Sequence, residues 1–571
     1  MRDSLARRQA AAKADTAKAP LAHAESPPVF GIASTMRWDR ADLFATGAIT
    51  VQDLLDRVIG VTTLRAGWIA APAVAAYLGD VRRVRVFYDG VERDELDPRA
   101  GGPLDLTQIN LWSLDDAAIE QGAGEIRVHL RSWRVTNTSP STRTDVSTGD
   151  QQTNLFRGFF GRRYGRGEAA QFAAQEFGTT PPRRFGSSSD QLGAVVRAGW
   201  ASGRWSVDVH GNRTSRHRGV ITAEFSGDSI PSVESTRMDA YFRAGYGDPD
   251  TSRVWAQALA SFGKYDYTGI RTPLPAGTPV VPDSELASLD TSIFRSQYVV
   301  SAGISRGSAR VSVTERLRAG FGLRRATPSI RGSYARGPLA ISAFVEGKGA
   351  DSVAHGDVIA RVSPGSFMTL LGSASRSADD RVEDRSTTTT YLRSEAGLRL
   401  RGLWFVGGIV RRDSVRLTGP RLFDTTFAAT PSATATGVSA AIRGRLWGPF
   451  YANVFGIRWS DSAGLYRPQY QTRSELYVST NLIERFPSGN FGLLGSIVHE
   501  YRSATRFPIA TGGLDRTGGY RTYSTLLEIR IADAVISWQF RNFLGERYSQ
   551  VPGFSAPRQT NFYGVRWQFW N

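Results

Sequence analysis

Six histidines have the widest chemical range in this 571-residue chain, because imidazole binds metals and transfers protons near neutral pH. None lies in a His-Glu-x-x-His motif or at another metal-ligand spacing. His210 and His217 are seven residues apart, which in a β-strand places them on opposite faces. The spacing therefore predicts no metal site. We expect neutral histidines, on the surface or in a lumen, at His23, His129, His210, His217, His355 and His499.

Motifs for phosphate binding and nucleophilic catalysis are also missing from the sequence. The two Gly-Lys pairs, at 263–264 and 347–348, are not followed by Ser or Thr and complete no P-loop. There is no Gly-x-Ser-x-Gly nucleophile elbow, and no two carboxylates pair convincingly. With no cysteine, thiol catalysis, thiolate zinc sites and disulfides are excluded. We predict no catalytic, cofactor-binding or metal-binding residues, and a protein that is not an enzyme.

The formal charge of +17 first suggests a nucleic-acid-binding protein. Only four of the 70 basic residues are lysines, however, and the arginines are spread along the whole chain. Dispersed arginine more often reflects surface or genome composition than a binding site. A soluble nucleic-acid-binding protein would show salt-sensitive DNA binding, and we expect no nucleic-acid partner.

The N-terminal residues predict little structure of their own. Met1 to Ala22 contains basic residues but no apolar run of the length that a secretory signal peptide needs. Ala, Lys, Asp and Pro dominate as far as Pro28, so residues 1–35 are predicted to be a disordered tail. The longest apolar stretch, 66–79, contains Pro72 and is too short to cross a membrane as a helix.

Residues 36–140 have mixed α and β patterns. The segment 51–58 places Leu54, Leu55 and Val58 on one side at helical spacing. The segments 81–88 and 124–130 alternate like strands, and Asp89-Gly90 predicts a turn after the first of them. This part is predicted to be a small α+β unit.

From Ser141 to Asn571 the pattern is strand alternation throughout. In 391–401, Leu392, Ala396 and Leu398 alternate with Arg393 and Glu395. Such alternation indicates a sheet with one apolar and one polar face. The segments 293–304 and 521–531 show the same pattern.

Short turns and longer connections also alternate along this region. Ten short turns are predicted, at 164–167, 201–204, 247–250, 305–308, 335–338, 363–366, 401–403, 447–449, 487–490 and 531–534. Two strands lie between successive turns, which gives about 22 antiparallel strands, the first near 141–149 and the last near 561–571. Short turns at one end and long loops at the other are typical of an outer-membrane barrel. A soluble propeller or solenoid is the alternative, but no repeat of fixed period is present.

The end of the chain resembles the last strands of TonB-dependent outer-membrane receptors. The resemblance is carried by 541–548 (Arg-Asn-Phe-Leu-Gly-Glu-Arg-Tyr), 551–554 (Val-Pro-Gly-Phe) and the alternating aromatic strand 561–569. In that strand Tyr563, Val565, Trp567 and Phe569 alternate with polar residues. Trp570 and Asn571 extend the chain past the aromatic residue on which such barrels usually end.

The region before the barrel resembles the plug domain of the same family. Segment 53–61 is similar to the plug's Asp-Leu-Leu element, with Ile59 where proline is usual. Segment 86–91 is similar to the strand and Asp-Gly turn that follow, and 114–128 to the closing strands, with the Gly-rich stretch before Gly124 deleted.

The resemblance implies an all-β transmembrane barrel of about 22 strands at 141–571. A reduced α+β plug at 36–140 would fill the lumen, because a barrel of this size is otherwise open. It implies location in the cell outer membrane, contact with its lipid, and a monomer. It also implies uptake of a scarce small molecule or metal chelate, such as a ferric siderophore, energised by the TonB complex. No TonB box is identified in 1–35, and we expect the reading frame to begin upstream.

Arginines in the predicted outer loops suggest the chemistry of a substrate, although no substrate-binding residue is assigned. A vestibule lined by Arg216, Arg218, Arg416, Arg421, Arg506 and Arg516 would attract anions by electrostatic focusing. Alternatively, these arginines bridge anionic lipid headgroups or pair with nearby carboxylates.

Two classes of function remain open. One is a plugged transporter coupled to TonB. The other is an uncoupled barrel, acting as a passive pore or as a surface-binding protein that retains a reduced plug.

Overall fold

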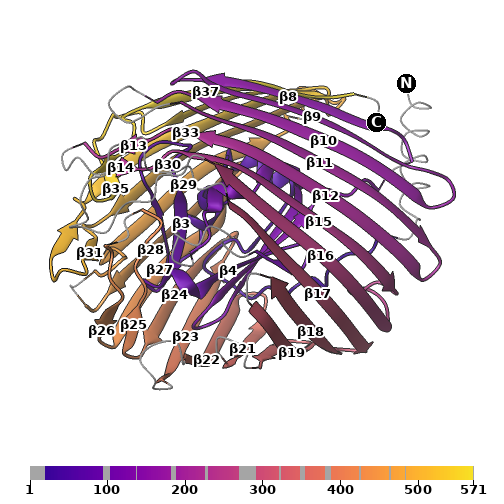
Figure 1. Cartoon of the computed structure of the whole chain (residues 1–571), viewed down its shortest axis with the longest axis horizontal. Coiled ribbons are helices and arrows are strands. Elements are labelled where there is room, and N and C mark those ends of the chain that lie inside the picture. Colours follow the sequence, from indigo (N-terminus) through magenta and orange to yellow (C-terminus); the bar gives the residue numbers. More distant parts are fainter. Residues whose placement is uncertain are drawn as a thin grey trace.

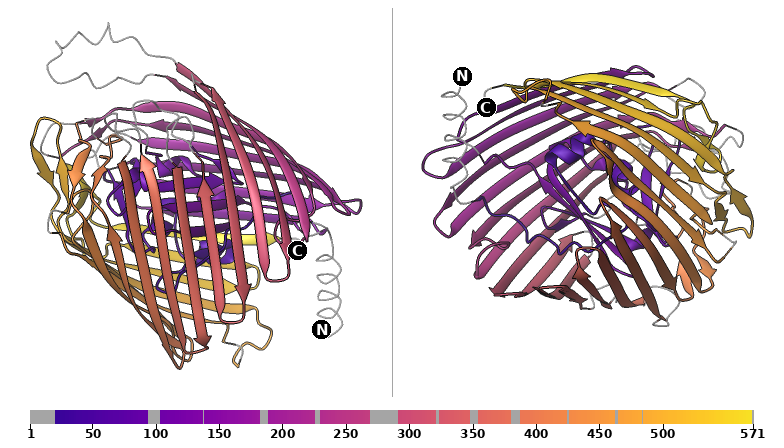
Figure 2. Two further views of the ribbon diagram at one scale, coloured as in Figure 1. Left: turned by 90° about the horizontal axis from the view of Figure 1, so that it is seen from below. Right: turned by 180° about the vertical axis from the view of Figure 1, so that it is seen from behind.

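In the computed structural model, a closed antiparallel barrel surrounds an N-terminal domain (Figures 1 and 2). Among the described residues no helix has the length and apolar character needed to cross a membrane. The structure describes residues 20–93, 103–136, 138–181, 188–224, 229–268, 291–320, 323–347, 354–379, 387–423, 426–461, 464–482 and 484–569.

The barrel has the 22 strands that alternation and turn spacing predict. Each predicted short turn lies between two consecutive strands, and β37 closes the barrel by pairing with β8. The strands are β8 (Ser141–Gly149), β9 (Thr153–Arg163), β10 (Glu168–Thr179), β11 (Ser189–Ser202), β12 (Trp205–Arg218), β15 (Val233–Tyr246), β16 (Val254–Thr268), β17 (Thr291–Arg306), β18 (Ala309–Gly320), β19 (Leu323–Arg336), β20 (Leu339–Glu346), β21 (Ala354–Gly365), β22 (Met368–Asp379), β23 (Thr387–Leu400), β24 (Leu403–Arg412), β27 (Ala435–Trp447), β28 (Phe450–Trp459), β29 (Tyr470–Thr480), β30 (Phe491–Arg502), β33 (Tyr520–Ile531), β34 (Ala534–Arg541) and β37 (Thr560–Phe569).

The apolar face of the barrel strands points outward, and the polar face points into the lumen. On β23, Leu392 and Leu398 are 48% and 51% exposed, whereas Arg393 and Glu395 are buried against the inner domain. This is the alternation expected of a barrel whose outer face contacts lipid.

The inner domain, called the plug from here on, is built around a five-stranded sheet with the order β1-β6-β7-β4-β5. The predicted helix is α3, and Leu54, Leu55 and Val58 all face the plug core. Asp89 and Gly90 form the predicted turn, both with positive φ. Its elements are β1 (Arg37–Asp39), α2 (Arg40–Ala45), α3 (Val51–Leu55), β2 (Val61–Arg65), β3 (Ala73–Tyr77), η1 (Val81–Arg83), β4 (Val84–Tyr88), β5 (Val91–Glu92), η3 (Leu106–Gln108), η4 (Leu111–Ser113), β6 (Leu114–Gln121) and β7 (Ile126–Ser132).

The prediction of a disordered tail is wrong for residues 20–35, which lie in the barrel; residues 1–19 lie outside the described residues. Leu21 packs with Val135, Ala169 and Ala201, and Phe30 joins the plug core. Composition indicated disorder because the segment has too few apolar residues to fold alone. The barrel wall and the plug supply the apolar surface that it lacks.

Four small hairpins extend the long connections at the end of the barrel opposite the short turns. In Figure 1 the labels β13, β31 and β35 mark three of them at the rim. Their strands are β13 (Ile221–Thr222) with β14 (Ser229–Ile230), β25 (Val415–Leu417) with β26 (Thr430–Ser432), β31 (Arg506–Pro508) with β32 (Leu514–Arg516), and β35 (Ser549–Val551) with β36 (Phe554–Ser555).

We expect Val313→Arg to weaken the assembled barrel by about 2–4 kcal/mol, because it would place a charge among outward-facing apolar side chains. Val313 lies on β18 and is 50% exposed. The measurement is the urea midpoint at which heat-modifiable migration on SDS gels is lost. Val313→Thr, which keeps the shape without a charge, should move that midpoint much less; equal effects of the two would contradict an apolar environment.

Candidate functional site

The plug is attached to the wall by buried ion pairs, most densely around the Asp89 turn. The Asp89 cluster consists of Asp89 and Arg134 from the plug, with Arg197, Asp208 and Tyr241 from β11, β12 and β15. Asp89 is 3.0 Å from Arg134 and 3.1 Å from Arg197, and Arg134 also pairs with Asp208 at 3.3 Å. The Tyr241 hydroxyl lies 2.9 Å from both Asp89 and Asp208.

Electrostatics keep Asp89 ionised in this buried position. Burial alone would raise its pKa, but Arg134 and Arg197 together hold the pKa well below the usual range. A depressed folded-state pKa means that this stabilisation is present above the ordinary carboxylate pKa and is lost as the pH falls through the folded value. The attachment is therefore complete at neutral pH.

Two further groups of charges join the plug to the strands that follow. Glu120 accepts hydrogen bonds from Arg127 at 3.1 Å and from Arg331 of β19 at 2.9 Å. Arg127 also reaches Asp357 of β21 at 2.7 Å. Glu92 pairs with Arg85 within the plug and with Arg318 of β18. Charged partners on both sides mean that removing one leaves a buried charge uncompensated.

Apolar contact between plug and wall is most extensive on β20 to β28, called the apolar arc, although Asp357 of β21 also lies there. The plug core, including Leu54, Leu55 and Val128, extends to wall residues of β20 to β28. These wall residues are Ala340, Ile359, Leu371, Tyr391, Val406, Val410, Ala435, Ala441, Phe455, Ile457 and Trp459.

A cap covers the plug on the side of the long connections. The cap consists of the four hairpins together with the connections that carry them. Trp68, at the apex of the plug, is 1% exposed and shares an apolar cluster with Phe427, Phe507, Phe554 and other cap residues. The connections also bind one another, as in the hydrogen bonds from Ala428 N to the Pro508 carbonyl and from Ala510 N to the Thr426 carbonyl.

The cap changes the interpretation of the loop arginines. Arg216 lies on β12 and points to the plug, where it binds Asp105 at 3.1 Å and the Ala70 carbonyl at 2.9 Å. Arg218, also on β12, is buried and binds the Pro231 carbonyl. The prediction that these two residues line a vestibule open to anions is therefore wrong. Strand β12 continues through both residues and directs their side chains toward the interior. Arg416 is half-buried on β25, whereas Arg421, Arg506 and Arg516 are exposed on the cap.

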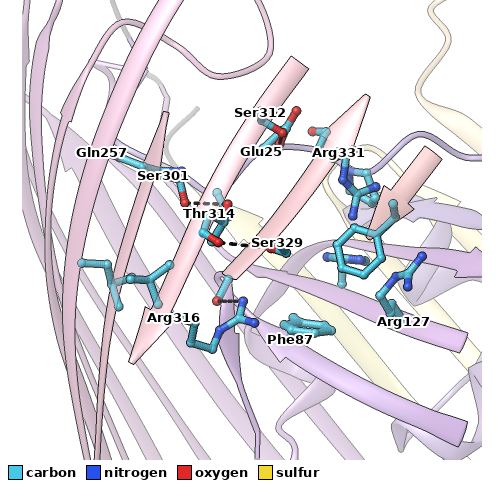
Figure 3. Close-up of a pocket in the computed structure, with 18 of the residues that line it drawn as sticks. Glu25, Phe87, Arg127, Gln257, Ser301, Ser312, Thr314, Arg316, Ser329 and Arg331 are labelled. Carbon is cyan, nitrogen blue, oxygen red and sulfur yellow. Dashed lines mark hydrogen bonds between the residues drawn. The ribbon is translucent and has the colours of Figure 1, made fainter. Parts of the chain in front are cut away.

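A cavity of about 100 Å³ lies between plug and wall on the side of the plug opposite the cap (Figure 3). Hydroxyl groups line its wall side: Ser301 and Thr314 lie 2.9 Å apart, and Ser329 donates to the Thr314 carbonyl at 3.3 Å. The plug side is formed by Phe87 of β4, and the guanidinium of Arg316 from β18 lies over its ring, 5.1 Å from the ring centre. The lining mixes these polar groups with apolar side chains such as Trp255 and Phe344, which suits water or a small solute with both polar and apolar parts.

Residues 20–36, called the strap, close this cavity toward the short turns. Glu25 accepts a hydrogen bond from Ser312 at 2.8 Å and belongs to the cavity lining (Figure 3). Glu25, Ser26, Pro27 and Arg331 also line a second, more open hollow of about 290 Å³. The strap thus forms part of the wall of both spaces and separates them.

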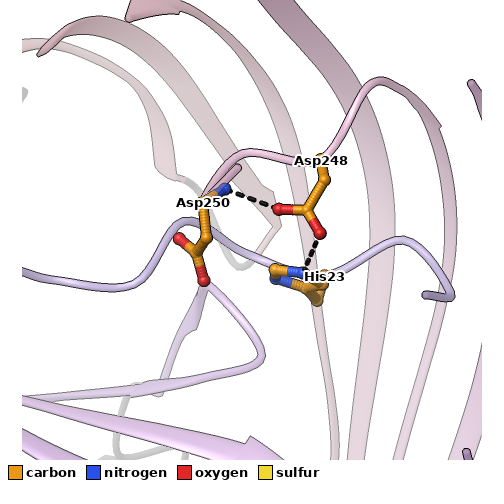
Figure 4. A group of neighbouring side chains, drawn as sticks. All are labelled: His23, Asp248 and Asp250. Atoms are coloured by element: carbon orange, nitrogen blue, oxygen red, sulfur yellow. Dashed lines mark hydrogen bonds and ion pairs between the residues drawn. The ribbon is translucent and has the colours of Figure 1, made fainter. Parts of the chain in front are cut away.

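His23 and Ser26 of the strap are attached to Asp248 and Asp250 in the turn between β15 and β16; Figure 4 shows His23 and the two aspartates. His23 lies 3.5 Å from Asp248, and Ser26 donates to Asp250 from its backbone N–H (2.8 Å) and its hydroxyl (2.5 Å). Burial would raise the pKa of Asp248, but the hydrogen bond from His23 lowers it to about 2. The ligand atoms of His23, Asp248 and Asp250 lie within 4.8 Å of one another, as a cation would require. Since Asp250 already accepts from Ser26, we interpret the group as an attachment point.

The remaining histidines lie on β7 of the plug and on the barrel strands β12, β21 and β30. On β12, His210 is buried and His217 exposed, which confirms their opposite faces. His129 lies 3.1 Å from Glu120, and His355 lies 3.0 Å from Asp357. No local signal could have predicted the His23 contacts, because its partners are more than 220 residues away.

We predict that Asp89→Asn loosens the plug, since Arg134 and Arg197 then share the single carboxylate of Asp208. The expected cost is about 3–5 kcal/mol, the range for breaking a buried ion pair. Faster amide hydrogen exchange in β4 and β7, with ion conductance across planar bilayers, is the expected readout. Asp515→Asn, on the exposed β32, is the matched control and should leave both unchanged. Unaltered exchange in Asp89→Asn would show that the cluster does not hold the plug.

The strap contacts predict how the cavity can be reached from the short-turn side. Because the chain has no cysteine, Ser301→Cys places a single reporter thiol in the cavity. Replacing both Asp248 and Asp250 by Asn should release the strap and speed maleimide labelling of that thiol at least tenfold. The control Asp533→Asn changes an exposed aspartate in another short turn and should have no effect.

A reporter at Ser373 on β22 completes that experiment. Ser373 and Ser301 are both 6% exposed, but Ser373 is paired with Ile359 of the apolar arc. Its labelling should stay slow in every background. If the Ser301 thiol also stays slow after strap release, the strap is not what closes the cavity.

Comparisons with known proteins find the same architecture among solved structures but not among sequence relatives. No protein-family model matches the sequence, and no curated protein matches it significantly. Solved structures do match over nearly the whole chain. The siderophore receptor PirA from Acinetobacter baumannii superimposes with a TM-score of 0.70 at 10% identity, over 93% of this chain and 98% of that one.

Two metal transporters give the same result. The FrpB iron transporter from Neisseria meningitidis has a TM-score of 0.70 at 9% identity, covering 94% of this chain and 100% of its own. The copper transporter OprC has a TM-score of 0.70 at 10% identity, covering 95% and 100%. The chain has the plug-and-barrel fold of TonB-dependent receptors.

Proposed function

We propose that the protein is an outer-membrane receptor that takes up a small solute through a plugged barrel. One observation carries the proposal: the lumen is filled by a domain held through ion pairs and hydrogen bonds, with a cap on one side and a strap on the other. A permanent seal needs no such arrangement, whereas a stopper that must move does. We also propose that the protein is not an enzyme, because its proposed activity is binding and transport.

The outer face of the barrel supports a place in the outer membrane. Outward residues are apolar along the strands, and aromatic side chains gather near the short turns. Trp205, Tyr164, Phe367 and Trp447 are 61%, 44%, 59% and 65% exposed there. Such a girdle is typical of the membrane interface of outer-membrane barrels. We propose a monomer with no nucleic-acid partner, whose arginines serve the lumen and the cap.

The cap suggests the chemistry of the substrate. Its outer surface carries Arg421, Arg506 and Arg516. The register of the β31–β32 hairpin places Arg506 directly opposite Arg516. Beneath them lie aromatic rings such as Phe427 and Phe507. An anionic chelate with apolar or aromatic parts would be attracted by the first layer and contact the second. The structural neighbours are named as siderophore, iron and copper proteins, which favours a metal chelate such as a ferric siderophore.

Energisation by TonB is the further part of the proposal. The strap lies on the short-turn side, where a periplasmic partner would act, and residues 1–19 precede it. A force on that segment would first detach His23 and Ser26, and then the plug. The alternative is an uncoupled surface-binding protein, which the close packing of the cap over Trp68 favours.

Uptake measurements distinguish these functions. Cells that express the full chain are given ⁵⁵Fe- and ⁶⁴Cu-labelled chelates isolated from conditioned medium, with and without a protonophore. Coupled transport predicts saturable accumulation that the protonophore abolishes. A passive pore gives linear, protonophore-insensitive entry, and a surface-binding protein gives binding without accumulation.

A charge-reversal pair tests the role of the cap in the same assay. Replacing Arg506 and Arg516 by Glu should reduce capture of anionic chelates at least tenfold, because both side chains are exposed on the cap. Arg336→Glu at an exposed short turn is the matched control and should behave as wild type. Capture that survives the double replacement would exclude the cap arginines from recognition.

A further inference from the structure

Three arginines on the outer face of the barrel share one height, above outward positions of their own strands that carry no charge. Arg376, Arg411 and Arg458 are all exposed, on β22, β24 and β28. Each lies eight residues beyond the first residue of its strand, counted from Met368, Leu403 and Phe450. All three strands begin at a short turn, so the count measures the same distance from that end.

This height corresponds to the outer boundary of the membrane. Eight residues at about 3.3 Å each, on strands tilted by about 40°, rise roughly 20 Å above the turn end. The apolar band of such barrels is about 25 Å tall. Between the turn and each arginine, the three outward positions carry no charge: Leu370, Gly372 and Ala374; Phe405, Gly407 and Ile409; Ala452, Val454 and Gly456.

The arginines occupy one arc of the barrel only. At the same count from the turn, β16 and β18 carry the exposed apolar residues Phe262 and Leu317. Arg213 of β12 and Glu176 of β10 also lie at this height, but both are far from the other three in the strand order. A general preference for charge at the boundary would not leave apolar residues at the same position elsewhere.

Each arginine of the arc faces a hydroxyl on the next strand. The cross-strand partners are Thr390 for Arg376, Thr436 for Arg411 and Tyr470 for Arg458. The three arginine backbones are spaced roughly 10–12 Å apart, from the spacing of strands and the two-residue offset between them. Among the residues that the structure describes, Asp413 is the carboxylate that pairs with them, 4.0 Å from Arg411 and itself 43% exposed. The surface is therefore rich in donors and carries net positive charge.

We propose that this arc, Arg376, Arg411 and Arg458 with Thr390, Thr436 and Tyr470, binds the phosphate groups of an outer-leaflet lipid headgroup. Guanidinium groups present planar, paired donors that match phosphate oxygens, and the hydroxyls add further donors. The apolar positions below the arginines accept the acyl chains of the same lipid. The inference rests on the proposed outer-membrane location but not on transport.

Lipid binding by the full-length protein tests the arc. The protein is mixed with micelles containing bisphosphorylated lipid A, and bound lipid is counted by native mass spectrometry. Replacing Arg376, Arg411 and Arg458 by Gln should weaken lipid A retention at least tenfold. Arg213→Gln, a single change at the same height, should retain lipid as wild type does. Heat-modifiable migration verifies that each variant is a folded barrel.

Two further arms identify the ligand. Lipid A stripped of its phosphates should bind wild type as weakly as lipid A binds the triple variant. Millimolar inorganic phosphate should not displace lipid A, because the acyl chains contribute to binding. Equal retention by the triple variant and wild type would overturn the proposal, as would equal binding of the stripped lipid. A change of oligomeric state in the triple variant would instead assign the arc to contact with a second copy. Failure here leaves the transport proposal intact, since the uptake assay reads a separate property.

Discussion

The rest of the structure depends on the buried charges between plug and wall. A barrel of 22 strands encloses a lumen too wide for its own side chains to fill, so a separate domain must occupy it. That domain is held by carboxylate–guanidinium contacts such as Asp89 with Arg134 and Arg197. Such contacts are weak as a net source of stability, because desolvation opposes the Coulomb attraction. They nevertheless fix the position of the plug relative to the wall, because any displacement leaves charges unpaired.

This balance explains how one interface can be both closed and releasable. An apolar interface of the same area would separate only by exposing its whole surface to water. The ion pairs that the plug makes with β11 to β19 can exchange their partners for water or for a polar solute, and the cavity beside them already provides polar contacts at Ser301 and Thr314. From β20 to β28 apolar contacts are more extensive, although polar contacts such as Arg127 with Asp357 and Arg393 with the Gln121 carbonyl lie there as well. The balance of ionic and apolar contacts thus differs around the plug, and the cap and strap cover its two ends.

Sequence reasoning predicted the barrel well because its signals are local. Alternation of residues such as Leu392 and Arg393 reports which face meets lipid, and the short turns fix the strand count. The plug motifs worked for the same reason: Leu54, Leu55 and Val58 indicate a helix without reference to the barrel. The strap was missed because Ala- and Pro-rich chain is ordered here only through tertiary contacts, such as Leu21 with Val135. The cap and the Asp89 cluster were missed because their members are far apart in sequence, and Arg216 was misplaced because β12 runs further than its turn residues suggest.

The central claim is that the plug must move relative to the wall for solute to pass. The direct measurement uses Asn110→Cys with Thr214→Cys, at a plug–wall contact of 3.0 Å between the native side chains, in a chain that has no other thiol. A short bifunctional methanethiosulfonate joins the two through reducible bonds, and chelate uptake is measured before and after reduction. Movement of the plug predicts that uptake is lost in the linked protein and recovers with dithiothreitol. Uptake that continues at the wild-type rate while the link is intact would contradict the account.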